Sequence, residues 1–119
     1  MTKVFVYGTL KCGGRNHRYL AGQQFIGEAR TGPGFTLYSL GDYPGMVRSN
    51  HVDHDVTGEV WAVSADCLAG LDELEGVNEG LYERVAISLL PPFVTPSVET
   101  YLYLRSIEGR RALGAEWRE

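Results

Sequence analysis

Hydrophobic positions along the chain gather into short runs that are typical of β-strands. The first run, Lys3–Tyr7, is apolar and aromatic and stops at Gly8, as expected of a buried central strand. Glycine- and proline-rich turns separate the runs that follow. The further predicted strands are Gln24–Ala29, Phe35–Leu40, Gly45–Arg48, Val56–Val63, Tyr82–Leu90 and Ser97–Leu104.

Two other segments have helical patterns. Asn16 can cap a short helix over His17–Ala21, which Gly22 would end. The longer segment, Ser64–Gly76, predicts an amphipathic helix whose first residue, a serine, is a favourable N-cap.

Many short strands with few helices predict an α+β fold. Long crossover helices are missing, so a wound parallel sheet is not expected. We expect a small mixed β-barrel or a strongly curled sheet, with two or three short flanking helices. The length of 119 residues supports one domain over residues 1–119, although the tail from about residue 107 has little pattern.

Glu75 is a carboxylate on the apolar face of the predicted helix. It follows Leu71 by four residues and therefore shares the face that must be buried. It also lies in the last turn before Gly76, where the negative end of the helix dipole disfavours another negative charge. Both effects raise a carboxyl pKa toward neutrality, where the group can act as a general base or acid. The alternative is a carboxylate that reaches water or pairs with a base such as Arg84.

Composition and charge narrow the classes of partner. The formal net charge of −4 and the pI near 5.3 argue against a general nucleic-acid or anionic-membrane partner. No apolar run is long enough to span a bilayer, and the N-terminus lacks the layout of a signal peptide. Two distant cysteines suit a reducing compartment. We therefore expect a cytoplasmic protein without a nucleic-acid or membrane partner.

The junction Tyr7–Lys11 is the second candidate for chemistry. A buried strand that breaks at glycine exposes consecutive backbone N–H groups that have no partner in the sheet. Such groups can form a concave nest for a carboxylate or an oxyanion, although a simple strand-ending turn explains the same pattern. A phosphate-binding P-loop is not supported, because Gly14-Arg15 stands where Lys-Ser/Thr is needed.

Three weaker candidates lie in loops. The segment His51–Asp55 holds potential metal ligands, but no second cluster completes a coordination shell, so no metal is predicted. Cys12 and His17 could form a thiolate pair but lack a third group to orient them. The basic residues near the glycine-rich loop either face solvent or attract an anionic substrate; they are Lys11, Arg15 and Arg18.

Three sequence motifs together resemble one known family. They are Val6-Tyr7-Gly8-Thr9-Leu10-Lys11, Asn16-His17-Arg18, and Leu71-Asp72-x-x-Glu75-Gly76 with Tyr82-Glu83-Arg84. The chain resembles the γ-glutamylcyclotransferase-like family, most closely its γ-glutamylamine cyclotransferase and AIG2-like branches, from Val4 to about Arg105. The resemblance implies a small β-barrel flanked by helices.

The resemblance also implies roles for individual residues. Glu75 would be the catalytic acid and base. The substrate-binding loop would comprise Tyr7, Gly8, Thr9 and Leu10, and aromatic pocket walls would include Tyr82 and Tyr103. No cofactor or metal would be needed.

The implied reaction is ring closure of a γ-glutamyl group. Its α-amine would attack its own γ-carbonyl, which yields 5-oxoproline and releases a free amine. One glutamate with a raised pKa could take a proton from the α-amine and return it to the leaving nitrogen. The substrate would be a small-molecule γ-glutamyl amine or peptide. The sequence identifies neither the leaving amine nor the oligomeric state.

A second hypothesis is a barrel without catalytic activity that binds a small carboxylate ligand or a partner protein. A binder of this kind has no reason to keep a carboxylate at Glu75, on an apolar face beside a helix end. If the chain is an enzyme, we expect its specificity to lie in the variable segments Gly41–Met46 and Pro91–Pro96.

Overall fold

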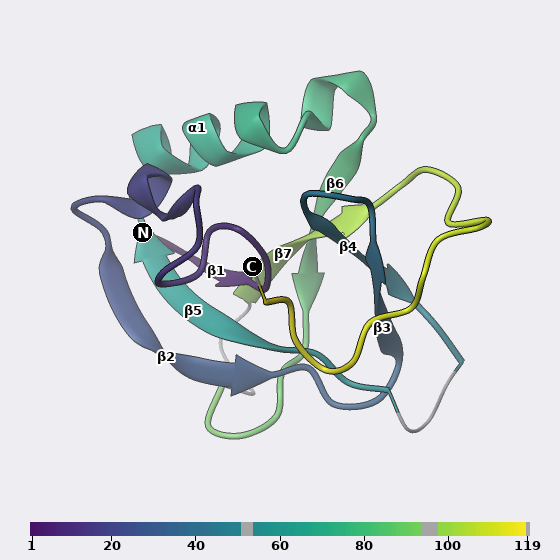
Figure 1. The fold of residues 1–119 in the computed structure, drawn as a ribbon. Helices are drawn as coiled ribbons and strands as arrows, with labels where there is room; N and C mark the ends of the chain where they lie inside the picture. Colours follow the sequence, from purple (N-terminus) through teal and green to yellow (C-terminus); the bar gives the residue numbers. More distant parts are fainter. Residues whose placement is uncertain (51–53, 94–97, 119) are drawn as a thin grey trace.

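The computed structural model describes residues 1–50, 54–93 and 98–118 of the chain (Figure 1). Its strands are β1 (Thr2–Val6), β2 (Gln24–Arg30), β3 (Phe35–Ser39), β4 (Pro44–Arg48), β5 (Thr57–Val63), β6 (Tyr82–Ile87) and β7 (Val98–Tyr103). One α-helix, α1 (Ala65–Leu74), and two 3-10 turns, η1 (His17–Leu20) and η2 (Val77–Glu79), are present in the described part. The α+β class expected from the sequence is confirmed.

The predicted strands are all found, with ends that shift by a few residues. The largest shift is in β6, which ends at Ile87 rather than at Leu90. Ser97, predicted to begin the last strand, lies outside the described residues. The turn η2 was not predicted, because three residues between two glycines carry no helical periodicity.

Five strands form one sheet in the order β2-β5-β1-β7-β6. The pair β1 and β7 is parallel, and the other neighbours in this sheet are antiparallel. Strands β3 and β4 form a separate antiparallel hairpin. The central place of β1 agrees with its apolar sequence, because a strand with neighbours on both sides is buried on both faces.

Helix α1 lies across one side of the five-stranded sheet (Figure 1). Ser64 caps its first turn by accepting a hydrogen bond from the backbone N–H of Cys67 at 3.1 Å. Leu71 is fully buried and packs in a cluster with Val4 and Val63 of the sheet. A second cluster, which includes Phe5 and Met46, fills the space between the sheet and the β3–β4 hairpin.

The predicted small mixed β-barrel is not confirmed, because the described strands form two separate sheets rather than one closed sheet. Strand β4 lies against β7, and a Cβ added at Gly45 would come within 2.9 Å of Tyr103 side-chain atoms. Two tyrosine hydroxyls connect the sheets: Tyr7 accepts from the Met46 N–H at 3.2 Å, and Tyr82 donates to the Pro44 carbonyl at 2.6 Å. Side chains thus satisfy backbone groups that barrel closure would pair in a ladder.

The C-terminal tail extends the smaller sheet and reaches the first loop. Its backbone bonds to β3 through the N–H of Leu113, which donates to Leu37 at 2.8 Å. Farther on, Ala115 accepts from the N–H of Thr57 at 2.7 Å, and Trp117 accepts from Lys11 Nζ at 3.0 Å. The tail is therefore part of the fold, although its sequence has little pattern.

In the described part of the chain, no helix has both the length and the apolar character needed to cross a membrane.

Candidate active site

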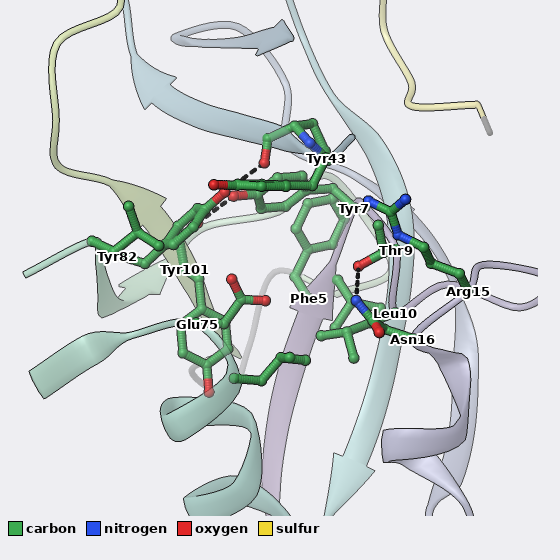
Figure 2. Close-up of a pocket in the computed structure, with 15 residues that line it drawn as sticks. Phe5, Tyr7, Thr9, Leu10, Arg15, Asn16, Tyr43, Glu75, Tyr82 and Tyr101 are labelled. Carbon is green, nitrogen blue, oxygen red and sulfur yellow. Dashed lines mark hydrogen bonds between the residues drawn. The ribbon is translucent and has the colours of Figure 1, made fainter. Parts of the chain in front are cut away.

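A cavity of about 260 Å³ opens between β1, the loop after it, the start of β4, the end of α1, and strands β6 and β7. It lies where the two sheets meet without a shared ladder (Figure 2). The lining residues are Phe5, Val6, Tyr7, Gly8, Thr9, Leu10, Arg15, Asn16, Tyr43, Pro44, Leu74, Glu75, Leu81, Tyr82 and Tyr101. The walls are thus mainly aromatic and aliphatic, with few polar groups, as in many small-molecule sites.

Glu75 lies at the C-terminal end of α1, one residue past the last helical position. Its backbone N–H still donates to the Leu71 carbonyl at 2.9 Å, so the side chain is fixed to the helix end. Gly76 then takes a left-handed conformation with φ of 64° and turns the chain away. The carboxyl group points into the cavity, between the tyrosine rings (Figure 2).

Burial raises the pKa of the Glu75 carboxyl from its ordinary value of 4.5 to about 7. No residue in the described part of the chain makes a hydrogen bond or an ion pair with this side chain. The raised pKa expected from the sequence is confirmed, and its cause is the loss of water around the charged form. A glutamate of this kind can both take and give a proton near neutral pH.

The alternative pairing of Glu75 with Arg84 is wrong. Arg84 Nε and Nη2 donate to the two carboxylate oxygens of Asp72 at 2.9 and 3.2 Å, and Nη1 donates to Glu99. The guanidinium group therefore already has two carboxylate partners on the face of the sheet that α1 covers.

The loop after β1 lines the cavity with residues whose backbone donors are free of protein partners in the described part of the chain. Within the described residues, the N–H groups of Gly8, Thr9 and Leu10 donate no hydrogen bond to the protein. Asn16 holds the loop, because its backbone N–H donates to the Thr9 carbonyl and its Nδ2 to Thr9 Oγ1, both at 2.9 Å. A Cβ at Gly8 would come within 2.9 Å of the Pro44 ring, so glycine is needed for this close approach.

Four tyrosines form much of the cavity wall: Tyr7, Tyr43, Tyr82 and Tyr101. Burial raises the pKa of Tyr7, Tyr82 and Tyr101, so these hydroxyls remain neutral near neutral pH. The Tyr7 hydroxyl is occupied by the Tyr101 carbonyl, to which it donates at 2.6 Å, and by the N–H of Met46. The ring of Tyr7, rather than its hydroxyl, is therefore what a ligand would contact.

Tyr103, expected as a pocket wall, lies behind the wall. Its ring packs edge-on against Tyr82 with the ring centroids 5.4 Å apart, and it is absent from the cavity lining. Tyr43 and Tyr101 line the cavity although the sequence did not assign them to it. The place of Tyr43 depends on how the β3–β4 hairpin docks, for which the sequence carries no local signal.

One of the weaker candidates described here lines the cavity, and the others do not. Of the three basic residues, Arg15 lines the cavity and donates to the Asp42 carbonyl. Cys12 Sγ lies 3.8 Å from His17 Nε2, and His17 Nδ1 lies 2.9 Å from the Leu10 carbonyl oxygen, so this pair has an orienting group after all.

The expected polar segment near residue 51 is only partly described. His51 and Asp53 lie outside the described residues. His54 Nδ1 lies 2.8 Å from Thr36 Oγ1, and Asp55 pairs with Arg30. No group of three potential metal ligands is found in the part that the structure describes.

Comparison with known proteins identifies the family of this chain. The family model described as "Gamma-glutamyl cyclotransferase, AIG2-like" matches residues 4–119. The chain belongs to this family. The match includes the tail after Arg105, which the sequence motifs alone did not reach.

Individual relatives agree with this assignment. A Vibrio cholerae protein provisionally named a gamma-glutamylcyclotransferase is 49% identical over 98 residues, which cover 82% of this chain and 80% of that protein. The gamma-L-glutamyl-butirosin B gamma-glutamyl cyclotransferase of Niallia circulans is 31% identical over 110 residues, or 88% of this chain and 69% of that protein. The crystal structure of a mouse AIG2-like protein is 28% identical with a TM-score of 0.79, and the match covers 91% and 81% of the two chains.

Proposed function

We propose that the protein is a γ-glutamyl cyclotransferase that releases 5-oxoproline and a free amine from a γ-glutamyl amine or small γ-glutamyl peptide. One observation carries the proposal. A partly buried carboxyl group with a pKa of about 7, that of Glu75, lines the same small cavity as Gly8, Thr9 and Leu10, whose N–H groups have no partner among the described residues.

Glu75 would act first as the general base. The α-ammonium of the substrate must lose a proton before its nitrogen can attack the γ-carbonyl carbon, and the Glu75 carboxylate accepts that proton. The new C–N bond closes a five-membered ring and moves charge onto the carbonyl oxygen. Attack within one molecule needs neither a covalent enzyme intermediate nor a cofactor, because the site gains rate by holding a conformer that can cyclise.

Glu75 would then act as the general acid. It returns the proton to the leaving nitrogen as the amide C–N bond breaks, which regenerates the carboxylate. The ring nitrogen then gives its second proton to the released amine, which departs as an ammonium ion. A pKa near the working pH suits a group that does both steps. The loop N–H groups would bind either the developing oxyanion or the substrate carboxylate, since both are anions that such donors stabilise.

The substrate class is proposed only as far as the γ-glutamyl group. The Niallia circulans relative is named for γ-L-glutamyl-butirosin B, which contains this group. The cavity of about 260 Å³ is slightly smaller than most ligand sites, which have volumes of about 300–1,000 Å³. It would enclose the γ-glutamyl part, and larger leaving amines would extend out of the cavity.

The test is a substrate panel assayed for 5-oxoproline: a γ-glutamyl amino acid, Nε-γ-glutamyl-lysine, glutathione and a γ-glutamyl alkylamine. We expect turnover of at least one compound, and a loss of at least ~100-fold in kcat for Glu75→Gln with substrate binding retained. Glu73→Gln removes the same charge from an exposed position of α1 and serves as the control. Near-normal turnover by Glu75→Gln would remove this residue from catalysis. Binding without any turnover by the natural chain would instead favour a non-catalytic binder.

A further inference from the structure

Asp72 joins α1 to the sheet through three hydrogen bonds. Its carboxylate accepts two from Arg84, at 2.9 and 3.2 Å, and one from the Tyr101 hydroxyl at 2.7 Å. Arg84 also pairs with Glu99 of β7. We refer to Asp72, Arg84, Tyr101 and Glu99 as the Asp72 clamp.

The register of β6 and β7 brings the clamp together. Arg84 and Tyr101 are directly opposite each other in the antiparallel pair, so their side chains leave the sheet on the same face. Glu99 is two residues before Tyr101 and therefore shares that face. Helix α1 crosses this face, and Asp72 lies three residues before Glu75, close to the helix end.

The clamp continues directly into the cavity. The ring of Tyr101 lines the cavity together with Glu75, while its hydroxyl holds Asp72. The backbone carbonyl of the same residue accepts a hydrogen bond from Tyr7 at 2.6 Å. Tyr101 therefore connects the end of α1, the cavity wall and β1.

Glu75 depends on these neighbours for its position. Its carboxyl group has no hydrogen-bond partner among the described residues, so only the backbone at the helix end and the surrounding rings fix it. A small outward movement of the helix end would carry the carboxyl group toward water. Misplacement by about 1 Å can cost on the order of 100-fold in rate.

We propose that Asp72 is a positioning residue for Glu75: the clamp holds the C-terminal end of α1 against β6 and β7, and thereby keeps the carboxyl group of Glu75 inside the cavity. This inference rests on the proposed cyclotransferase function, because it assigns a role in that reaction. It adds a second carboxylate to the site, one that acts without touching the substrate.

Because the Asp72 clamp is partly exposed, we expect it to orient the end of α1 rather than to stabilise the fold. The side chains of Asp72, Arg84 and Glu99 are 27%, 30% and 32% exposed, and ion pairs that water reaches contribute little to the free energy of folding. A bidentate arginine–carboxylate pair nevertheless fixes direction, because two parallel hydrogen bonds define the angle between the groups. Its effect should therefore be seen in catalysis more than in unfolding.

The titratable and charged groups that face Glu75 come from several elements. They are Tyr7 directly after β1, Tyr82 of β6, Tyr101 of β7, and Arg15 and Tyr43 from loops of the cavity lining. Asp72→Asn and Glu73→Gln each remove one negative charge from the same turn of α1, and Tyr101→Phe removes a neutral hydroxyl. A shift in the titration of Glu75 that Asp72→Asn and Tyr101→Phe share, and that Glu73→Gln lacks, therefore reports its access to water.

The main experiment compares Asp72→Asn with Glu73→Gln, an exposed position on the same turn of α1. For Asp72→Asn we expect kcat to fall ~10–100-fold while KM stays within about 3-fold, because the loop donors are untouched. The acid limb of the pH–rate profile should move to lower pH as Glu75 gains water. Glu73→Gln should keep both kcat and the profile. A folded Asp72→Asn with unchanged kcat, or with lower kcat and an unmoved profile, overturns the inference.

A second variant covers the case in which Asp72→Asn does not fold. Tyr101→Phe removes one hydrogen bond of the clamp and leaves the ion pairs in place. It should lower kcat by roughly 3-fold and move the profile in the same direction, the scale of one lost hydrogen bond near 0.6 kcal/mol. If the acid limb of the pH–rate profile of Tyr101→Phe lies at the same pH as in the natural protein, the proposed role of Asp72 is contradicted.

Titration of the Glu75 carboxyl carbon by NMR separates failure of the inference from failure of the proposed function. It needs no substrate. If the natural protein turns over no γ-glutamyl compound, the proposed function fails, but a midpoint that falls in Asp72→Asn and not in Glu73→Gln still supports the clamp. If the protein is active and the midpoint of Glu75 is the same in both proteins, the clamp alone is rejected.

Discussion

Two carboxylates three residues apart near the end of α1 have opposite surroundings. Asp72 accepts three hydrogen bonds, two from Arg84 and one from Tyr101, and remains partly exposed. Glu75 has no such partner in the described structure and lies among aromatic rings. The same chemical group is thus used once to hold the helix and once, by our proposal, to move protons.

The difference arises from where the helix ends. Asp72 is still within α1 and faces strands β6 and β7, where the opposing pair Arg84 and Tyr101 meets it. Glu75 follows the last helical residue, so its side chain leaves the helix over the cavity. One helix can therefore present a satisfied carboxylate and a desolvated one, without any change in residue chemistry between them.

The sharpest way to separate the two carboxylates is to measure stability against pH. The pKa of Glu75 is raised in the folded state, from 4.5 to about 7. Its contribution is therefore fully present below pH 4.5 and is lost as pH rises through 7. Glu75→Gln should be more stable than the natural protein at pH 8 by up to roughly 3 kcal/mol, less what water in the cavity screens.

Urea unfolding at pH 8 and pH 4 checks this expectation. At pH 4 the two proteins should agree, because the carboxyl group is then protonated and neutral like glutamine. The Asp72→Asn variant should be no more stable than the natural protein at pH 8, because Arg84 and Tyr101 donate stronger hydrogen bonds to a carboxylate than to an amide. A Glu75→Gln variant that is less stable at pH 8 would mean that this carboxylate is not desolvated.

The catalytic rate should follow the same ionisation of Glu75, and the expected change is slightly smaller in free energy than the change in stability. As a base, Glu75 must be deprotonated, so kcat/KM should rise with pH with a midpoint near 7. At pH 5 it should be about 100-fold below the plateau, two units under the midpoint. Ionisation of the substrate amine falls on the basic side and does not mask this limb. A limb near 4.5 would show an ordinary, hydrated glutamate.

The turn that releases Glu75 from the helix is the next place to break the site. Gly76 has φ of +64°, where a residue with a Cβ loses about 1–2 kcal/mol. A Cβ there would also lie 3.2 Å from that of Leu81, a cavity residue. Gly76→Ala should therefore lower both stability and kcat.

Gly70 gives the matched control for this substitution. It lies inside α1, and a Cβ added there meets no atom within 4 Å. Gly70→Ala should raise stability by about 0.5–1 kcal/mol, because alanine favours helix more than glycine does, and should leave kcat unchanged. Thermal unfolding of the Gly76→Ala and Gly70→Ala variants checks the two expected changes in stability. Equal effects at the two positions would show that the left-handed turn is unimportant.

Local sequence signals predicted the parts of the site that depend on a single element. The stop of β1 at Gly8 and the stop of α1 at Gly76 follow from glycine's freedom, and the apolar face placed Glu75 toward the core. The Asp72–Arg84 pair and the place of Tyr101 in the cavity wall depend on the register of β6 and β7, which no local sequence pattern predicts. The open junction between the sheets, where a small barrel or a curled sheet was expected, depends on how the β3–β4 hairpin docks.

Tyr82 and Tyr103 show this limit most clearly and give the smallest expected effect. They are opposite each other in β6 and β7, and the sequence assigned both to the pocket wall. In the structure only Tyr82 lines the cavity, where its hydroxyl donates to the Pro44 carbonyl, whereas Tyr103 lies behind it, against β4 at Gly45.

Tyr82→Phe should cost about 1 kcal/mol of stability and raise KM a few-fold, since the Pro44 carbonyl loses its hydrogen-bond partner. Tyr103→Phe should change stability by less than about 0.5 kcal/mol, as for substitutions that remove no buried hydrogen bond. If denaturant unfolding and initial rates instead show the larger loss for Tyr103→Phe, its hydroxyl has a role in the site that its position behind the wall does not explain.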